Sequence, residues 1–221
     1  MIICLEGING SGKTSLAQIL MDSWLAAGGR TAVKAEPVQS TAFGRDVRTA
    51  IMETGDLNPE AEALAFASAR LHAADAIDPA AEDLVVLERW AGAVVAYGTV
   101  AGTDSLLLSA LESVLSASVA IDRTVVVDVP GLVAAERLAT QSDTNRFETM
   151  GADYLEQVRQ SYLDWGRNHE CVVVPGTLPH NDAQAWATEL VSSLLASARQ
   201  HIASMTHHVR DTTYAGSERQ Q

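Results

Sequence analysis

Basic residues and cysteines are scarce in this sequence. Lysine and arginine together number 15, whereas aspartate and glutamate number 28, so the formal net charge is −13. Nucleic acids and anionic membranes bind basic surfaces, and this charge balance argues against nonspecific binding to either of them. Only Cys4 and Cys171 could form a disulfide. Each lies in an apolar run typical of a buried strand, so we expect two free thiols instead.

Long hydrophobic segments are missing as well. No apolar run is long enough to span a bilayer, and no charged region precedes the first apolar run, so neither a membrane anchor nor a signal peptide is expected. The expected location is therefore the cytoplasm. A chain of 221 residues, 47% of them hydrophobic, has the size and the core of a single domain, alone or with a small lid.

One glycine-rich motif stands out near the N-terminus, where residues 7–14 read GINGSGKT. It matches G-x-x-x-x-G-K-[ST], follows a short apolar run typical of a buried strand, and precedes apolar residues at helical spacing. In that setting the loop N–H groups and the helix N-terminus bind phosphate oxygens. We expect Lys13 to contact the β- and γ-phosphates of ATP and Thr14 to ligate Mg²⁺. The predicted nucleotide-binding residues are Gly7, Asn9, Gly10, Ser11, Gly12, Lys13, Thr14 and Ser15.

The rest of the chain alternates between strand-like and helical patterns. Further strands are expected at residues 31–35, 84–87, 124–129 and 171–174. This alternation predicts an α/β fold in which a five-stranded parallel sheet lies between two helical layers. Ligands of such sheets bind beyond the carboxyl ends of the strands, so residues that follow strands are the first candidates for a site. We expect one domain over residues 1–196 and a flexible polar tail over 197–221, where apolar periodicity is lost.

Short motifs behind the predicted strands resemble the thymidylate kinases, a family of P-loop nucleoside monophosphate kinases. The resemblance extends from Met1 to about Leu195, and it is specific because the motifs occur in the family's order at compatible distances. Its segments are Leu5-Glu6-Gly7 through Thr14, Glu36-Pro37, Phe66 to Arg70, Glu88-Arg89-Trp90, Ala96-Tyr97, Asp128-Val129 through Arg137, and Asn145-Arg146-Phe147-Glu148. The resemblance implies a three-layer α/β/α P-loop kinase fold with a short lid at about residues 137–147. It also implies that ATP and Mg²⁺ are cofactors, that the substrates are small-molecule nucleotides, and that the chain forms a homodimer.

The resemblance implies, in addition, where an acceptor nucleotide would bind. Phe66 offers a flat face on which a base can stack, and Arg70, one helical turn later, can donate to a base carbonyl. Arg89 directly follows a hydrophobic strand, where its planar guanidinium suits the capture of a phosphate. The predicted substrate-binding residues are Asn9, Glu36, Phe66, Arg70, Arg89 and Tyr97.

Phosphoryl transfer needs positive charge around the transferred group, and the predicted catalytic residues follow from this need. Arg137 and Arg146 lie at either end of the expected lid, whose closure would bring their charge to the reaction and exclude water. Glu88 can orient Arg89, bind a water of the metal ion or accept a hydrogen bond from an acceptor hydroxyl. The predicted catalytic set is Lys13, Glu36, Glu88, Arg89, Arg137 and Arg146, and the predicted metal ligands are Thr14 and Glu88.

Several positions depart from the family's usual pattern. Asn9 stands where an aspartate usually meets the sugar 3′-hydroxyl, and no arginine accompanies Glu36-Pro37 to bind the acceptor's phosphate. Ala93 and Val94 stand where two small polar residues often help to read thymine. The lid keeps Arg137 but not the run of arginines that some members carry. A lost charge-assisted hydrogen bond to phosphate costs roughly 1.5–3 kcal/mol, so these changes bear on the choice of substrate.

Three functions are compatible with these patterns. The first is an ATP-dependent kinase for dTMP or a related deoxynucleotide, which the longest run of matching motifs favours. The second is a deoxynucleoside kinase, because Glu36-Pro37-Val38 and Glu88-Arg89 also resemble that family and Glu36 could act as general base toward a 5′-hydroxyl. The third is a nucleotide-binding regulator without turnover, because the lid is poor in arginine.

Overall fold

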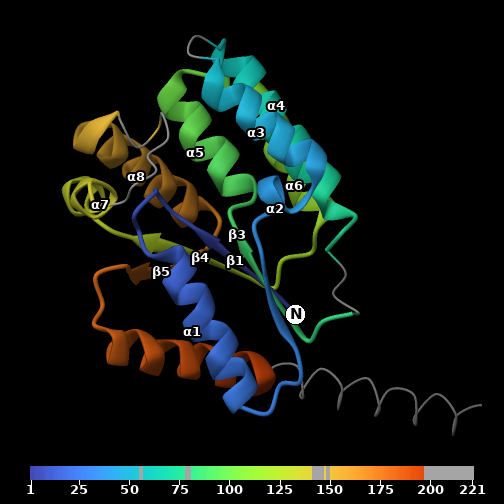
Figure 1. Cartoon of the computed structure of the whole chain (residues 1–221), viewed down its shortest axis with the longest axis vertical. Helices are drawn as coiled ribbons and strands as arrows, with labels where there is room; N and C mark the ends of the chain where they lie inside the picture. Colours follow the sequence, from blue (N-terminus) through green and yellow to red (C-terminus); the bar gives the residue numbers. More distant parts are fainter. Residues whose placement is uncertain (55–56, 78–80, 141–146, 148–149, 197–221) are drawn as a thin grey trace, which may run out of the picture.

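Five parallel strands form a sheet at the centre of the molecule (Figure 1). The computed structural model describes residues 1–54, 57–77, 81–140, 147 and 150–196. The strands are β1 (Ile2–Glu6), β2 (Ala32–Ala35), β3 (Leu84–Glu88), β4 (Arg123–Asp128) and β5 (Val172–Pro175). Their order in the sheet is β2-β3-β1-β4-β5, so the first strand of the chain lies in the middle of the sheet.

Helices cover both faces of this sheet. Their bounds are α1 (Lys13–Ala26), α2 (Pro37–Ser40), α3 (Ala42–Glu53), α4 (Pro59–Ala74), α5 (Ala91–Ala101), α6 (Ser105–Ser118), α7 (Gly131–Leu138) and α8 (Gly151–Asn168). Residues 180–196 are also helical. Helix α1 and the helix at 180–196 cover one face, whereas α4, α5, α6 and α8 cover the other (Figure 1). This arrangement confirms the predicted three-layer α/β/α fold.

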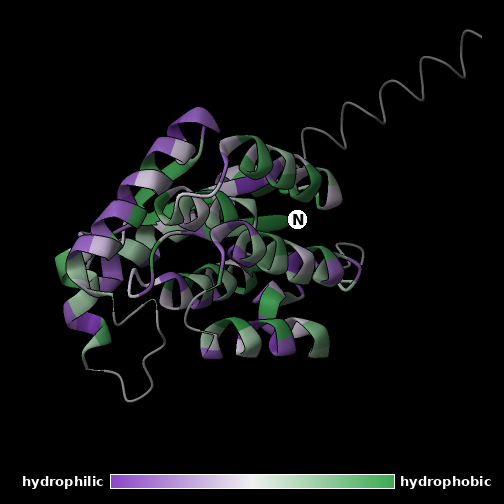
Figure 2. Cartoon of the chain, turned by 90° about the horizontal axis from the view of Figure 1, so that it is seen from above, coloured by the Kyte–Doolittle hydropathy of each residue, from purple (hydrophilic) through white to green (hydrophobic). Residues whose placement is uncertain are grey.

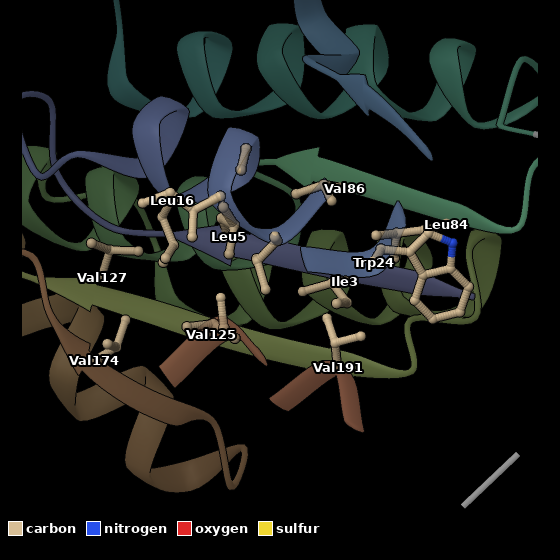
Figure 3. Packing of buried hydrophobic residues seen from close by; sticks show 14 of the residues in the cluster. Ile3, Leu5, Leu16, Trp24, Leu84, Val86, Val125, Val127, Val174 and Val191 are labelled. Atoms are coloured by element: carbon tan, nitrogen blue, oxygen red, sulfur yellow. The ribbon is translucent and has the colours of Figure 1, made fainter. Parts of the chain in front are cut away.

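Alternate side chains of each strand enter different cores, because successive residues of a strand point to opposite faces. Ile3 and Leu5 of β1 pack with Leu16 and Trp24 of α1 and with Val191 of the helix at 180–196 (Figure 3). Their neighbours on β1 face the other way, toward α4, α5 and α6. The central strands β1 and β3 are therefore buried on both faces, and the strand ribbon beside the N-terminus is hydrophobic in Figure 2.

Apolar runs in the sequence place all five strands to within one residue at each end. Helix α4 begins at Pro59, behind an Asn58 side chain that accepts the N–H groups of Glu60 and Ala61 at 2.9 and 3.2 Å. Cys4 and Cys171 are free thiols, as predicted. Most of the expected lid and the whole expected tail fall at 141–146, 148–149 and 197–221, outside the described residues.

Among the described residues, no helix combines the length and the apolar character that crossing a bilayer requires.

Candidate active site

The P-loop joins the end of β1 to the start of α1 and depends on glycine for its path. Gly7 has a φ of +137°, and a Cβ at this position would lie 2.6 Å from the carbonyl oxygen of Val127 on β4. Gly12 has a φ of +96° and directly precedes α1. Other residues rarely adopt these conformations. The close approach of the loop to β4 at Gly7 and the turn into the helix at Gly12 therefore both require glycine. The free N–H groups of the first turn of α1 then lie at the end of the loop, where anions bind.

Lys13 lies within the curve of this loop, with 6% of its surface exposed. Its ammonium group donates to the carbonyl oxygen of Ile8 at 2.7 Å and to the hydroxyl of Ser11 at 3.2 Å. Burial and the neighbouring charge of Arg89 lower the pKa of Lys13, against the opposing effect of Glu88. Because an anion would stabilise this buried ammonium, the geometry favours a phosphate group beside it.

Thr14 and Glu88 face each other between the start of α1 and the end of β3. The Thr14 hydroxyl donates to Oε2 of Glu88 at 3.0 Å, and Nζ of Lys34 lies 3.1 Å from Oε1 of the same carboxylate. Hydroxyl and carboxylate oxygens are ligands that Mg²⁺ prefers, so this pair fits the predicted metal site. Within the described ranges no group of three or more histidines, cysteines, aspartates and glutamates could hold a metal. The ion would therefore need further oxygens from nucleotide phosphates and water.

Arg89 lies at the centre of the site in a backbone conformation that is rare for arginine, with a φ of +71°. Its guanidinium donates to Oδ1 of Asn9 in the P-loop and, at 2.9 Å, to the hydroxyl of Tyr162 on α8. It also lies over the ring of Tyr97 on α5, 5.3 Å from the ring centroid. Partners from three segments of the chain therefore fix the direction of this cation.

Aromatic side chains form another wall of the pocket. The ring of Phe147 lies 6.3 Å from that of Phe66 and 5.6 Å from that of Tyr97, measured between centroids. Arg70 is buried beside this wall, where its guanidinium lies 5.7 Å over the Phe66 ring and donates to the Phe66 carbonyl oxygen at 3.2 Å. Its Nε has no hydrogen-bond partner among the described residues. A flat, polar ligand edge would suit this combination of ring faces and an available N–H.

These groups line a pocket of about 690 Å³, a volume typical of small-molecule sites. Gly7 does not line the pocket, and Arg146 lies outside the described residues. Predicted site residues that do line it are Asn9, Gly10, Ser11, Gly12, Lys13, Thr14, Ser15, Glu36, Phe66, Arg70, Glu88, Arg89, Tyr97 and Arg137.

Arg137 lies in the last turn of α7 and braces the P-loop. Its guanidinium donates to the carbonyl oxygens of Gly10 and Gly176, each at 3.0 Å. It therefore joins the loop after β1 to the turn after β5. Leu138, the next residue of the expected lid, is buried at the end of the same helix. The lid itself stays a prediction, because residues 141–146 lie outside the described ranges.

Three residues of this region were not assigned to the site from the sequence. Arg48 of α3 lines the pocket, and its local sequence gave no signal. Lys34 pairs with Glu88 only because β2 lies beside β3 in the sheet. Tyr162 lies on α8 in an apolar stripe with Leu155 and Val158, and its hydroxyl accepts a hydrogen bond from Arg89. A tyrosine in such a stripe is itself a signal, because a buried hydroxyl needs a partner.

Both halves of the site open into the same space: a loop shaped for phosphates, and a wall of rings with a fixed guanidinium for a second ligand. A phosphoryl group can pass from one nucleotide to another only if both are bound in the same pocket. The chain accordingly falls in the class of P-loop nucleotide kinases. The family model for thymidylate kinase matches residues 5–186. The chain belongs to the thymidylate kinase family, and it is an ATP-dependent nucleotide kinase.

Curated relatives match this chain over most of its length. A thymidylate kinase of Synechococcus sp. (strain CC9311) is 32% identical over 212 residues, which cover 90% of this chain and 99% of the relative. A thymidylate kinase of Syntrophotalea carbinolica is 31% identical over 202 residues, with 84% of this chain and 93% of the relative covered. One of Bordetella petrii is 32% identical over 199 residues, with coverages of 88% and 92%. These matches confirm the predicted family and do not favour the deoxynucleoside kinase or the regulator.

Proposed function

We propose that this chain transfers the γ-phosphoryl group of ATP to the 5′-phosphate of dTMP or a closely related pyrimidine deoxynucleotide. The observation that carries the proposal is the position of Arg89, a cation fixed between the P-loop and the aromatic wall. A nucleoside is uncharged at its 5′ end, whereas a nucleotide brings a phosphate that a guanidinium can bind through two hydrogen bonds. The names of the relatives support thymidylate as the acceptor.

At the donor end of the pocket, the P-loop would bind the phosphates of ATP. The loop N–H groups and Lys13 would contact the β- and γ-phosphates. Thr14 and Glu88 would hold Mg²⁺, which supplies neutralising charge between the phosphate oxygens when it is bound. Arg137 would keep the loop in shape through its bonds to Gly10 and Gly176. Arg146 stays a predicted lid residue that would add charge on closure.

At the acceptor end, the base would stack against Phe66 and the phosphate would lie beside Arg89. Arg70 would donate to a carbonyl oxygen of the base, since its Nε has no partner among the described residues. Arg48 lines the same pocket and would supply the second phosphate-binding cation that the segment around Glu36 lacks. Glu36 itself is half-buried at the pocket and accepts a hydrogen bond from Gln39 at 2.7 Å. We expect it to contact the acceptor rather than to act as a base.

The subsite for the base is largely apolar. Ala93 and Val94 line the pocket and offer no hydrogen bond from a side chain. An apolar surface rejects an altered ligand only weakly, whereas a site built around a hydrogen bond rejects a ligand that cannot make it strongly. We therefore expect pyrimidines with altered substituents to be accepted beside thymine, provided that they keep a carbonyl oxygen for Arg70.

An acceptor screen with ATP and Mg²⁺, monitored by ADP formation, tests the proposal. Purified chain is supplied in turn with dTMP, dUMP, dCMP and thymidine. We expect turnover with dTMP and dUMP, because both carry the phosphate and the same base carbonyl. Activity with thymidine but not with dTMP would overturn the proposal. ATP binding without ADP formation for any acceptor would overturn it as well.

Replacing the central guanidinium gives the sharper test. Arg89→Ala removes a charge-assisted contact to phosphate, so we expect the KM for dTMP to rise roughly 10- to 150-fold. Arg167→Ala is the control, because Arg167 is exposed on α8 and pairs with Asp164 of the same helix. Steady-state kinetics with dTMP varied at saturating ATP measure the effect. An unchanged KM in Arg89→Ala would refute the assigned role.

We also propose that two chains associate through α4 and α6. The outer faces of these helices carry exposed apolar side chains, whereas monomeric proteins rarely gather such residues in one patch. The residues concerned are Leu64 and Leu71 of α4 and Leu106 and Val114 of α6. Helix α6 adds a further argument, because Glu112 is its only charged residue and is half-buried against α8. The cytoplasmic location stays a prediction from the sequence.

A further inference from the structure

Glu6 is a fully buried carboxylate that none of the roles above uses. It ends β1, directly before the P-loop, and 0% of its surface is exposed. Oε1 accepts the backbone N–H of Trp90 at 2.7 Å and lies 3.8 Å from the Cys4 thiol. Oε2 has no hydrogen-bond partner among the described residues. An ionisable group is rarely kept in such surroundings without a structural or functional role.

The first contact holds the turn that carries Arg89. The N–H of Arg89 donates to the Leu5 carbonyl oxygen at 2.9 Å and so ends the ladder between β1 and β3. Arg89 then adopts its positive φ, and the chain leaves the sheet. The next N–H, that of Trp90, is buried and has no strand carbonyl to bind, and the Glu6 side chain accepts it instead. A buried N–H without an acceptor would be costly, so Glu6 makes this rare turn possible.

The space around the carboxylate is shaped for it. Gly92 lies in the first turn of α5, and a Cβ there would come within 3.0 Å of Glu6 Cδ and 2.6 Å of Trp165 Cζ3. The absence of a side chain at this position lets the carboxylate approach the N-terminus of an 11-residue helix. The partial positive charge of a helix N-terminus favours an anion.

The second contribution of Glu6 is electrostatic. Three of the cations that line the pocket lie away from water, since Lys13 and Arg70 are buried and Arg89 is half-buried. The carboxylate interacts favourably with all three. Like charges that are gathered away from water repel one another unless a counter-charge is present. Glu88 provides a negative counter-charge at the predicted metal site, and Glu6 provides one close to Arg89.

We propose that Glu6 is a positioning residue for phosphoryl transfer: it holds the Arg89-Trp90 turn and thereby fixes the guanidinium that receives the acceptor phosphate. Glu6 touches neither nucleotide in this assignment and acts through Arg89. The inference rests on the proposed function only for the identity of the ligand that Arg89 binds.

Kinetics of two variants test the positioning role. Glu6→Ala removes the acceptor of the Trp90 N–H, so we expect the KM for dTMP to rise at least about tenfold while the KM for ATP changes less than about twofold. Glu6→Gln keeps an oxygen that can accept this N–H, and it should recover most of the loss. Ser23→Ala is the control, because Ser23 is buried on the opposite face of the sheet and accepts from Gln184. An unchanged KM for dTMP in Glu6→Ala, or an equal rise in both KM values, would overturn the proposal.

A double-mutant cycle of thermal stability tests, without any substrate, whether Glu6 holds the Arg89-Trp90 turn. Glycine at position 89 adopts many backbone conformations and would let the chain turn the Trp90 N–H toward another acceptor, so in an Arg89→Gly background the turn should depend less on Glu6. We expect Glu6→Ala to lower the Tm clearly less in that background than in the wild-type chain. Equal losses of Tm in both backgrounds would show that Glu6 does not hold this turn. If the wild-type chain fails to phosphorylate dTMP, the proposed function falls, and this cycle still tests the link between Glu6 and Arg89.

Discussion

Burial sets the properties of the charged residues around the pocket. It lowers the pKa of Lys13 and of Arg70, and it raises the pKa of Glu6. In each case the low-dielectric surroundings disfavour the charged form. Phosphate groups would reverse the trend for the two cations, because they bring negative charge into the same space. The site is therefore expected to gain stability when nucleotides bind, as any ligand that prefers the folded state provides.

We expect Glu6 to make the stability of the free chain depend on pH. Burial raises the pKa of this carboxyl group above the ordinary value of about 4.3, although the Trp90 N–H opposes the change. The folded state keeps the proton to a higher pH than the unfolded chain does. Stability from this group is therefore complete below the ordinary pKa and is lost as the pH rises through the raised pKa.

The pH dependence can be measured by comparing the wild-type chain with Glu6→Gln, whose side chain does not titrate. The Tm of Glu6→Gln relative to the wild-type chain should increase as the pH rises above the ordinary pKa of about 4.3, because only the wild-type chain has a proton to lose. Thermal unfolding of both proteins in the same set of buffers measures the difference. A difference that stays constant over this range would contradict the expectation.

At the scale of elements, the strands were the easiest part to predict from the sequence. Runs such as residues 84–87 are apolar throughout because both faces of a parallel sheet are covered, and this leaves few other interpretations. The P-loop was also predictable, since its spacing and its setting between strand and helix are specific. Contacts between elements that are distant in the sequence could not be predicted. That Lys34 reaches Glu88, or Tyr162 reaches Arg89, follows from strand order and helix placement, which local patterns do not encode.

The packing of α7 against α8 gives a prediction at this scale. A Cβ at Gly131 would lie 2.5 Å from the carbonyl oxygen of Ala152 and 2.6 Å from the backbone nitrogen of Glu156. Gly131→Ala must therefore push the two helices apart, and we expect it to lower the free energy of unfolding by about 1–3 kcal/mol. Urea denaturation measures the change. Leu132→Ala serves as the control, because Leu132 is largely exposed on the same helix and should change stability little.

Activity adds a second readout to this variant. Arg137 lies on α7 and braces the P-loop, so a displaced α7 should also raise the KM for ATP. A Gly131→Ala protein with unaltered stability and unaltered kinetics would show that the close approach of the two helices is not needed.

At the scale of the whole molecule, the proposed dimer is open to a direct test. Leu64 and Val114 lie exposed on α4 and α6. Charges in an apolar interface are costly, so the double variant Leu64→Glu/Val114→Glu should convert the dimer to a monomer. Light scattering after size-exclusion chromatography gives the mass. Leu132→Glu, which places the same charge on α7, should leave the mass unchanged. A wild-type chain that elutes as a monomer at all concentrations would contradict the proposed association.

The central place of β1 has a consequence for synthesis on the ribosome. Strand β1 is made first, but its neighbours β3 and β4 follow only at residues 84–88 and 123–128. One edge of β1 therefore has no hydrogen-bonding partner until residue 88 of the 221 has been made, and the other edge has none until residue 128, after more than half of the chain. The bond from Arg137 to Gly176 forms later still. Cellular ATP can begin to protect the growing chain only in the final stage of translation, and until then chaperones have a long window in which to bind it.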